Sequence, residues 1–501
     1  MEKKLAELKA RLQEIYDLKA ASAVLEWDQS TYMPPGGAPA RARQMALLAR
    51  LAHERGIDPK LGALLEDLRP YEESLAYDSD GASLIRVARQ DYEKAVQVPA
   101  SFMAEASRHF AETYQAWVAA RPADDFASVQ PFLEKTLDLS RQYSDYFADR
   151  EHVADPLIDR HDPGMKAETV RALFAELRSA MVSIVQAITE QPPADSRCLG
   201  RYYPEDRQWD LSLEVIDRLG YDFERGRQDR SPHPFTTNFS VGDVRITNRV
   251  RERDLGEALF GAIHEAGHAM YEQGVDANLE GTPLGIGTSA GVHESQSRLW
   301  ENIVGRSRPF WTFFYPRLQA VFPEQLGSTT LDAFYRAINK VERSLIRTEA
   351  DEVTYNLHVM LRFDFELEML EGKLAVRDLP EAWRARFQAD LGIVPLDDQD
   401  GVLQDVHWFA GPIGGTFQGY TLGNVLGAQF YEAALHDHPG IPAEMEKGEF
   451  GTLHEWLRSK IYRHGRKFTT AELVERVTGG PMQIEPYIGY LKKKYGELYA
   501  L

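Results

Sequence analysis

Apolar residues in the first part of the chain recur three or four positions apart, which is the spacing of one face of an α-helix. At the N-terminus this repeat runs through Leu5, Leu8, Leu12 and Ile15. The same spacing recurs over residues 38–54, 82–119, 124–150 and 166–190. The helix-breaking run Pro34 to Gly37 separates the first two segments, and Gln191 to Pro193 ends the last one. The first half of the chain is therefore predicted to be almost entirely helical.

The pattern changes between residues 222 and 249, where β-branched and aromatic residues become frequent. The runs PFTTNFS and DVRITNRV are separated by a short Val-Gly-Asp turn, so they predict a β-hairpin. Helical spacing returns at Asp254 and continues to the end of the chain. One predicted helix carries the apolar stripe Leu331, Phe334, Ile338, Val341 and Leu345. The predicted fold class is mainly α, with a small β-hairpin or sheet.

The chain contains no repeat of solenoid period and no linker rich in Gly, Ser or Pro. We therefore expect a single domain over residues 1–501. Within it we expect a helical wall over about 1–195, a hairpin and its neighbouring helices over about 220–430, and C-terminal helices over about 431–501.

The composition is that of a soluble globular protein, with 43% hydrophobic and 27% charged residues. Subtracting 77 acidic from 57 basic residues gives a net charge of -20, which disfavours nucleic acid and anionic membrane surfaces as partners. The N-terminus lacks the apolar core of a secretory signal, so we expect a cytoplasmic protein. The longest uncharged run, 406–431, holds six glycines and predicts a buried loop and helix rather than a membrane span. The single cysteine, Cys198, leaves His, Asp and Glu as the metal ligands available.

A metal motif follows the predicted hairpin. His264 and His268 are four residues apart on a predicted helix that begins at Asp254 and ends near Gly274, so both imidazoles project from one face. Glu265 lies beside them and can take a proton from a water molecule that the metal activates. The alternative is a chance pattern on a solvated helix, which the small and apolar neighbours of the motif disfavour.

A catalytic site of this kind needs a third protein ligand and one open position. The candidates downstream are Glu272, Glu280, His293 and Glu294. Glu294 is the best placed, because it follows a Gly-rich turn and begins a segment of helical character that can cross the first helix. In the alternative interpretation, Glu294 only caps that helix.

At these residues the sequence resembles the carboxypeptidase Taq-type metallocarboxypeptidases, and the resemblance extends over nearly the whole chain. The motifs that carry it are His233-Pro234-Phe235, Asp243 to Thr247, His264 to His268, His293 to Gln296, Ile346 to Asp351 and Gly401 to Trp408. The resemblance implies Glu294 as the third ligand and a large helical zincin-type peptidase fold with a long substrate groove. It also implies a homodimer that removes C-terminal residues from peptides.

A carboxypeptidase must bind a free terminal carboxylate, and the planar guanidinium group does so with paired hydrogen bonds. Arg347 is the first candidate, on an apolar-striped helix with Asp351 one turn further on, and Arg245 on the hairpin is the second. Both have plainer interpretations as surface cations paired with Asp351 and Asp243. His233, in the first motif, is a further substrate-binding candidate. Residues 235–239 are a candidate edge strand for pairing with the peptide backbone, and the alternative is that these strands only brace the metal helix.

Peptide hydrolysis develops a negatively charged oxygen, which preorganised donors stabilise. His407 and Tyr420 suit this role, in a Gly-rich segment similar to those of thimet oligopeptidase-like and angiotensin-converting-enzyme-like peptidases. Alternatively, Tyr420 belongs to the core.

The main hypothesis is a metal-dependent carboxypeptidase that acts on peptides with a free C-terminus. Its cofactor is one divalent ion, with zinc first and cobalt or manganese as alternatives. The competing hypotheses are a helical oligopeptidase that cuts internal bonds and a non-catalytic helical scaffold with a metal site. Glu265 favours catalysis over the scaffold, because a site that only binds metal needs no base.

Overall fold

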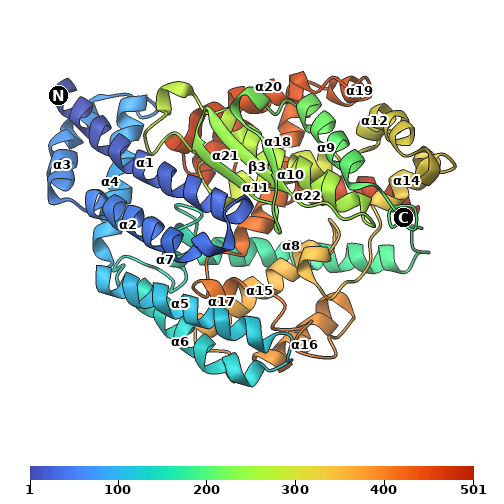
Figure 1. The fold of residues 1–501 in the computed structure, drawn as a ribbon, viewed down its shortest axis with the longest axis horizontal. Coiled ribbons are helices and arrows are strands. Elements are labelled where there is room, and N and C mark those ends of the chain that lie inside the picture. The colour runs from blue at the N-terminus through green and yellow to red at the C-terminus, as the bar shows by residue number, and fades with distance from the viewer. The chain divides into compact units, whose positions relative to one another are not determined.

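The computed structural model describes residues 1–501 and divides them into two compact units, each assembled from three separate stretches of chain (Figure 1). Unit 1 comprises Met1–Val96, Ser196–Ile338 and Phe430–Pro481. Unit 2 comprises Gln97–Asp195, Asn339–Gln429 and Met482–Leu501. The predicted helical wall over 1–195 thus contributes to both units, and the single domain over 1–501 stays a prediction.

Unit 1 holds the three strands of the structure and most of its helices. The strands are β1 (Gln228–Arg230), β2 (Thr236–Ser240) and β3 (Asp243–Asn248). The helices of the first stretch are α1 (Glu2–Thr31), η1 (Pro35–Gly37), α2 (Ala38–Gly56), α3 (Pro59–Ser74) and α4 (Asp80–Gln97, whose last residue is in unit 2). Those of the second stretch are α9 (Glu205–Leu219), η2 (Phe223–Arg225), α10 (Leu255–Gln273), η3 (Ala277–Leu279), α11 (Ala290–Arg298), η4 (Leu299–Val304), α12 (Arg308–Val321), α13 (Pro323–Leu326) and α14 (Leu331–Ile338). The third stretch adds α19 (Ile441–Met445), α20 (Gly451–Lys460), η7 (Tyr462–Lys467) and α21 (Thr470–Thr478).

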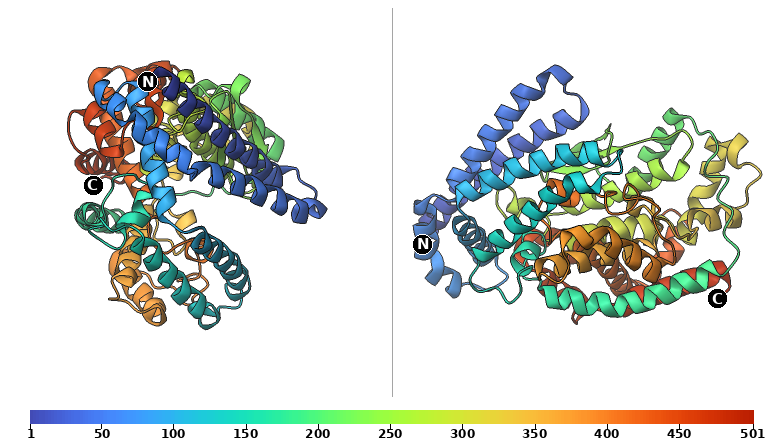
Figure 2. Two further views of the ribbon diagram at one scale, coloured as in Figure 1. Left: turned by 90° about the vertical axis from the view of Figure 1, so that its left-hand side faces the viewer. Right: turned by 90° about the horizontal axis from the view of Figure 1, so that it is seen from below.

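Unit 2 is built from helices alone. They are α5 (Ala100–Ala120), α6 (Phe126–Asp145), α7 (Asp155–Asp159), α8 (Ala167–Thr189), η5 (Arg347–Glu349), α15 (Tyr355–Leu370), η6 (Val376–Asp378), α16 (Leu379–Leu391), α17 (His407–Ala410) and α22 (Glu485–Tyr499). Helix α18 (Gln418–Asp437) begins in unit 2 and ends in unit 1. In the right-hand view of Figure 2, α8 and the C-terminal α22 run side by side. The predicted mainly α fold class is confirmed.

The first predicted pair of helices is confirmed. Helices α1 and α2 meet at the Pro34 to Gly37 turn and pack along each other, as Figure 1 shows in dark blue. The apolar stripe buries Leu8 and Leu12 against leucines of α3, while Leu5 and Ile15 lie partly buried at the rim of the same cluster. Burial of these side chains is what stabilises a helix of this length in water.

The predicted hairpin is confirmed and belongs to a three-stranded sheet of order β1-β3-β2. Strands β2 and β3 are antiparallel, with Thr237 opposite Arg245, and β2 is an edge strand. Strand β1 pairs in parallel with β3 and was not predicted, because three residues are too few for a recognisable alternation. Val244 and Ile246 of β3 are fully buried, and the sheet lies against α10 (Figure 1).

Helix α10 is nearly all buried, as its small and apolar residues predict. The Asp254 side chain caps its N-terminus by accepting hydrogen bonds from the backbone N–H of Gly256 and Glu257. Glu257 does not complete a capping box, because its carboxylate pairs with Arg249 and Arg251 instead.

The predicted helix through Leu345 is wrong beyond Ile338. Helix α14 ends there, and the backbone N–H groups of the next residues bond to distant side chains instead of to the preceding turn. Val341 donates to the Tyr499 hydroxyl and Glu342 donates to the Asp351 carboxylate. Tertiary partners therefore replace the helical hydrogen bonds that the apolar stripe predicts.

The uncharged run over 406–431 forms α17, a loop and the first part of α18, as expected. One helix, α8, is long and apolar enough to cross a membrane, judged by its length and composition. Its residues Phe174, Leu177 and Met181 are buried in the protein.

Gly267 allows α11 to approach α10 closely, because a Cβ atom there would lie 2.7 Å from the Cα of Ser297 and 2.8 Å from the carbonyl oxygen of Gln296. Both contacts are with backbone, which cannot rotate away. Gly267→Ala is therefore expected to push the helices apart and to lower the free energy of unfolding by about 1–3 kcal/mol. Thermal unfolding measures this loss.

Gly261→Ala is the matched control on the same helix. A Cβ there would meet only the side-chain oxygen of Asn248, at 3.2 Å. If both variants unfolded at the wild-type temperature, the close approach would not limit the packing of α10 on α11.

Candidate active site

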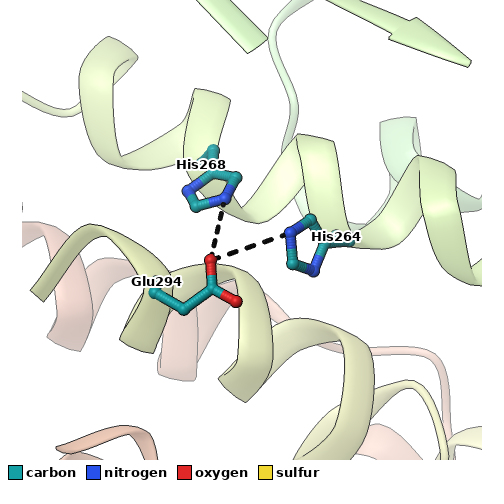
Figure 3. Close-up of side chains that lie close together, drawn as sticks. All are labelled: His264, His268 and Glu294. Atoms are coloured by element: carbon teal, nitrogen blue, oxygen red, sulfur yellow. Dashed lines mark ion pairs between the residues drawn. The ribbon is translucent and has the colours of Figure 1, made fainter. Parts of the chain in front are cut away.

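Helices α10 and α11 place two imidazoles and one carboxylate around a common point (Figure 3). His264 and His268 project from one face of α10, and Glu294 of α11 faces them. The Oε2 atom of Glu294 lies 3.4 Å from Nε2 of His268 and 3.9 Å from Nε2 of His264. The spacing argument for the two histidines thus agrees with the geometry, and Glu294 does not cap its helix. Ser289 is the residue that caps α11.

This group fits a divalent ion. Ligand atoms at about 2.0–2.1 Å from a tetrahedral zinc lie roughly 3.3 Å apart, close to the separations here. Burial alone would raise the pKa of Glu294, but Arg298 and the two histidines outweigh burial and hold that pKa well below its ordinary value. Two imidazole nitrogens and an ionised carboxylate are the donor set of a catalytic zinc site with an open position.

His264 is held by a hydrogen bond at Nδ1, the ring nitrogen that faces away from Glu294. The Nδ1 atom of His264 lies 2.9 Å from Oε2 of Glu301, which also accepts from Arg298. Burial would raise the pKa of Glu301, but Arg298, His264 and Arg306 bring it to about 2. An ionised Glu301 accepts only, so His264 carries its proton on Nδ1 and turns the Nε2 lone pair toward Glu294.

His268 is held differently, through a second imidazole. Its Nδ1 lies 2.6 Å from Nδ1 of His293, and Nε2 of His293 lies 2.7 Å from the Oε1 of Glu272. Two of the candidate third ligands therefore contact His268 or each other instead of joining the metal group. The fourth candidate, Glu280, is exposed and lies outside it as well.

Glu265 is oriented by the edge strand. The Thr236 hydroxyl lies 2.7 Å from Oε2 of Glu265 and 3.0 Å from its backbone carbonyl oxygen. Sequence reasoning missed Thr236, although strand alternation carried a signal: residues 236 and 238 share one face of β2, before the register shifts between Asn238 and Ser240. With Thr236 donating to Oε2, the Oε1 atom remains to accept a proton.

Arg245 and His233 lie in the same unit. Arg245 makes a paired salt bridge with Asp243 at 2.8 Å, as its plainer interpretation predicts, and its guanidinium lies 4.5 Å from the ring centre of the buried Trp27. His233 is exposed and its Nδ1 bonds to the carbonyl oxygen of Pro234. Neither side chain belongs to the group of metal ligands.

In unit 2, Arg347 is buried, but the predicted helix and partner are wrong. It lies in the short 3-10 helix η5 and pairs with Asp405, with Nη2 2.8 Å and Nε 3.0 Å from the carboxylate oxygens. Asp351 instead accepts backbone hydrogen bonds from Val353 and Thr354 at the start of the next helical turn. Asp405 was missed because 58 residues separate it from Arg347.

Asp405 also contacts Arg362 and His407, the second of which was predicted as a donor together with Tyr420. Arg362 donates to its Oδ2 at 2.5 Å, and Nδ1 of His407 lies 3.4 Å from its Oδ1. On the other side of the ring, Nε2 of His407 lies 3.2 Å from the Tyr420 hydroxyl. The structure therefore brings Arg347, His407 and Tyr420 together around one carboxylate.

Trp408 belongs to the core beside this cluster. Its Nε1 donates to the buried carboxyl group of Glu366 at 2.8 Å. Burial outweighs this donor and raises the pKa of Glu366 to about 8, so the group is mostly neutral at pH 7. Glu366 therefore adds little negative charge near Arg362.

A second group of possible ligands, His152, Glu168 and Glu371, also lies in unit 2. Arg171 and Lys373 both pair with Glu371, so its negative charge is already neutralised. Two cations at the carboxylate make this group an ion-pair cluster rather than a metal site.

Comparisons with known proteins agree with the geometry. The sequence profile of the family described as carboxypeptidase Taq (M32) metallopeptidase matches residues 7–495. The chain is 42% identical to thermostable carboxypeptidase 1 of Thermus thermophilus, covering 96% of each chain, and 36% identical to carboxypeptidase 1 of Bacillus subtilis, covering 98% of this chain and 97% of the relative. The crystal structure of the M32 carboxypeptidase from Deinococcus radiodurans R1 superposes with a TM-score of 0.97 at 52% identity over 100% of both chains. The chain therefore belongs to the carboxypeptidase Taq (M32) family of metallopeptidases.

Proposed function

We propose that this metallocarboxypeptidase removes the last residue of a peptide with His264, His268 and Glu294 as metal ligands and Glu265 as general base. The observation that carries the proposal is the group in Figure 3, in which three ligand atoms converge while the helix that supplies the histidines also supplies a buried carboxylate. A site that only stores metal has no use for Glu265, nor for a donor such as Thr236 that orients it.

A divalent ion at this group supplies Lewis acidity, which lowers the pKa of a water molecule and polarises the scissile carbonyl. Glu265 then takes the proton of the attacking water on Oε1 and passes it to the departing amine nitrogen. Thr236 keeps the carboxylate in the orientation that both transfers need. The water oxygen bonds to the scissile carbonyl carbon, the C–N bond breaks as this proton reaches the nitrogen, and the last residue leaves as a free amino acid.

Recognition of the terminal carboxylate is assigned to Arg347. Asp405 occupies the Nε and Nη2 edge of its guanidinium, and the Tyr355 hydroxyl lies 3.0 Å from Nη1. The side chain is thereby rigid, and Nη1 and Nη2 keep donors for a second carboxylate. Arg245, already paired with Asp243, stays the second candidate for this role, and His233 a candidate for substrate contact.

His407 and Tyr420 are assigned to the negatively charged oxygen of the transition state. Their hydrogen bond at 3.2 Å aligns an imidazole N–H and a phenol O–H as neighbouring donors. The edge strand β2 is assigned to the extended peptide backbone, since its outer N–H and C=O groups have no neighbouring strand.

We further propose zinc as the resident ion, a homodimer, and a cytoplasmic location, with neither nucleic acid nor membrane as partner. The donor set supports zinc, although cobalt and manganese also accept two imidazoles and a carboxylate. Elemental analysis of the purified protein is expected to return one zinc per chain, and light scattering a mass of twice 56.8 kDa. A metal-free preparation with full activity would contradict the metal assignment.

Substrate charge tests the role of Arg347. A peptide with a free C-terminus is expected to be trimmed by single residues, and its amidated counterpart to be cleaved far more slowly. Removing one partner of a buried charge pair costs about 2–5 kcal/mol, so Arg347→Gln is expected to lower kcat/KM for the free acid by roughly 10²–10³-fold. The kcat/KM for the amidated peptide, which has no terminal carboxylate to contact Arg347, is expected to change much less.

Arg343→Gln is the control, because Arg343 is exposed on the same segment and bonds to Thr189. Mass spectrometry of the products separates single-residue trimming from internal cuts. Equal cleavage of acid and amide by the wild type would exclude a carboxypeptidase.

Thr236→Val tests the orientation of the base. Valine keeps the shape of threonine and removes only the hydroxyl that bonds to Glu265, a hydrogen bond to a charged group worth about 1.5–3 kcal/mol. The expected result is a fall in kcat of roughly 10- to 100-fold, with KM and bound metal unchanged. Thr237→Val, on the opposite face of the same strand, is expected to keep wild-type kcat. Equal kcat in the two variants would remove Thr236 from the mechanism.

A further inference from the structure

A continuous line of short contacts leads from the edge strand to the metal ligand His268. Asn238 of β2 donates from Nδ2 to Oε2 of Glu272 at 2.5 Å. The Oε1 atom of Glu272 lies 2.7 Å from Nε2 of His293 and accepts the backbone N–H of Gly287 at 3.0 Å. The Nδ1 atom of His293 then lies 2.6 Å from Nδ1 of His268. Glu272 is buried, so these partners replace its hydration.

The direction of donation along this line follows from the chemistry of its ends. An ionised carboxylate only accepts, so His293 must carry a proton on Nε2 to bond with Glu272. When His268 binds a metal through Nε2, its ring proton is on Nδ1, so the facing Nδ1 of His293 accepts that proton in a hydrogen bond. With its proton on Nδ1, His268 presents a lone pair on Nε2, the atom that lies 3.4 Å from Glu294. The opposite direction would place a proton on Nε2 of His268 and block a metal.

We propose that Glu272 and His293 are positioning residues that fix the tautomer and ring orientation of His268 for metal binding. The proposal rests on the metal site of the proposed function and adds to it a role for two residues that are not ligands. It also gives Asn238 a part, because this side chain links the orienting pair to the strand assigned to the substrate.

The environment of His293 leaves its ring little freedom. Its ring centre lies 4.7 Å from that of His268 and 5.1 Å from that of Tyr271. A Cβ atom at Gly287 would lie only 2.7 Å from Cδ2 of His293, so the backbone closes the remaining side. A ring confined in this way keeps one orientation, so its two nitrogen atoms stay directed at His268 and Glu272.

Each of the two histidines of the proposed metal site is thus oriented by a carboxylate, one directly and the other through a second imidazole. Glu301 reaches His264 directly from the helix that follows α11. Glu272 lies on α10 itself, one turn beyond His268, and acts through a ring supplied by α11. His293 is the neighbour of the ligand Glu294 in sequence, so the same contacts also fix α11, and with it the third ligand, against α10.

Zinc affinity of the full-length protein tests the proposal, measured by competition with a chromogenic chelator. Outer partners of ligating histidines typically contribute a factor of 10–100 in metal affinity. Glu272→Met, which keeps the length and removes the acceptor, is expected to raise the Kd for zinc roughly 10- to 100-fold. Glu272→Gln keeps an acceptor oxygen and is expected to lose less.

Glu257→Met is the matched control, because Glu257 lies on the same helix and pairs with Arg249 and Arg251 rather than with the site. A purely structural role for Glu272 would lower the thermal stability of both methionine variants while leaving zinc affinity equal. Wild-type zinc affinity in Glu272→Met would overturn the proposal.

His293→Phe keeps the ring volume and removes both nitrogens, so it gives a second test if Glu272→Met does not fold. It is expected to raise the Kd as far as Glu272→Met does, and unchanged affinity would overturn the proposal. His264→Ala separates this inference from the proposed function. If His264→Ala retained the wild-type Kd, the proposed metal site itself would be wrong. If His264→Ala lost zinc while His293→Phe kept it, the metal site would stand and only the positioning role of Glu272 and His293 would be wrong.

Discussion

The approach of α11 to α10 at Gly267 is the contact on which the metal centre depends. One helix supplies both imidazoles and the proposed base, and the other supplies the proposed third ligand together with His293. A ligand group a few ångströms across tolerates almost no error in the distance between two helix axes. The missing Cβ of Gly267 lets the backbone of Gln296 and Ser297 touch α10, and this contact sets that distance. The HEAGH sequence therefore contributes to helix packing as well as to the proposed metal site.

Buried charge is the second constraint. Glu294, Glu301 and Glu272 are removed from water in unit 1, and each is compensated by histidine, arginine or amide donors. Unit 2 shows the opposite balance, since Asp405 alone faces both Arg347 and Arg362. Burial, with Arg347 close by, lowers the pKa of Arg362 to about 10, and both arginines remain charged at neutral pH. A chain of net charge -20 thus holds a buried surplus of positive charge around Asp405, which suits the role proposed for Arg347.

The features that could be predicted from the sequence are those with a local period or a fixed spacing. Leu8 and Leu12 mark a helical core face, and residues four apart place His264 and His268 together. Glu294 could be ranked first among four candidates, but only the structure shows that its carboxylate lies beside both histidines. The partner of Arg347 could not be predicted, because Asp405 lies 58 residues away and such a contact leaves no periodic signal. For the same reason the stripe through Leu345 misled: Val341 and Glu342 find partners at Tyr499 and Asp351 that no local pattern records.

Strand β2 shows how secondary structure converts sequence spacing into catalytic geometry. Side chains two apart on a strand share a face, and on this face Thr236 reaches Glu265 while Asn238 reaches Glu272. These two carboxylates are seven residues apart on α10, two helical turns along the same side. The strand therefore contacts the helix at two points, one at the proposed base Glu265 and one behind the proposed metal ligand His268. A shift of β2 by one residue would turn Thr237 and Phe239 toward the helix and remove both donors at once. Its pairing with β3, in which the register shifts between Asn238 and Ser240 before the turn at Val241 and Gly242, is thus part of the proposed site even though no strand residue is a proposed ligand.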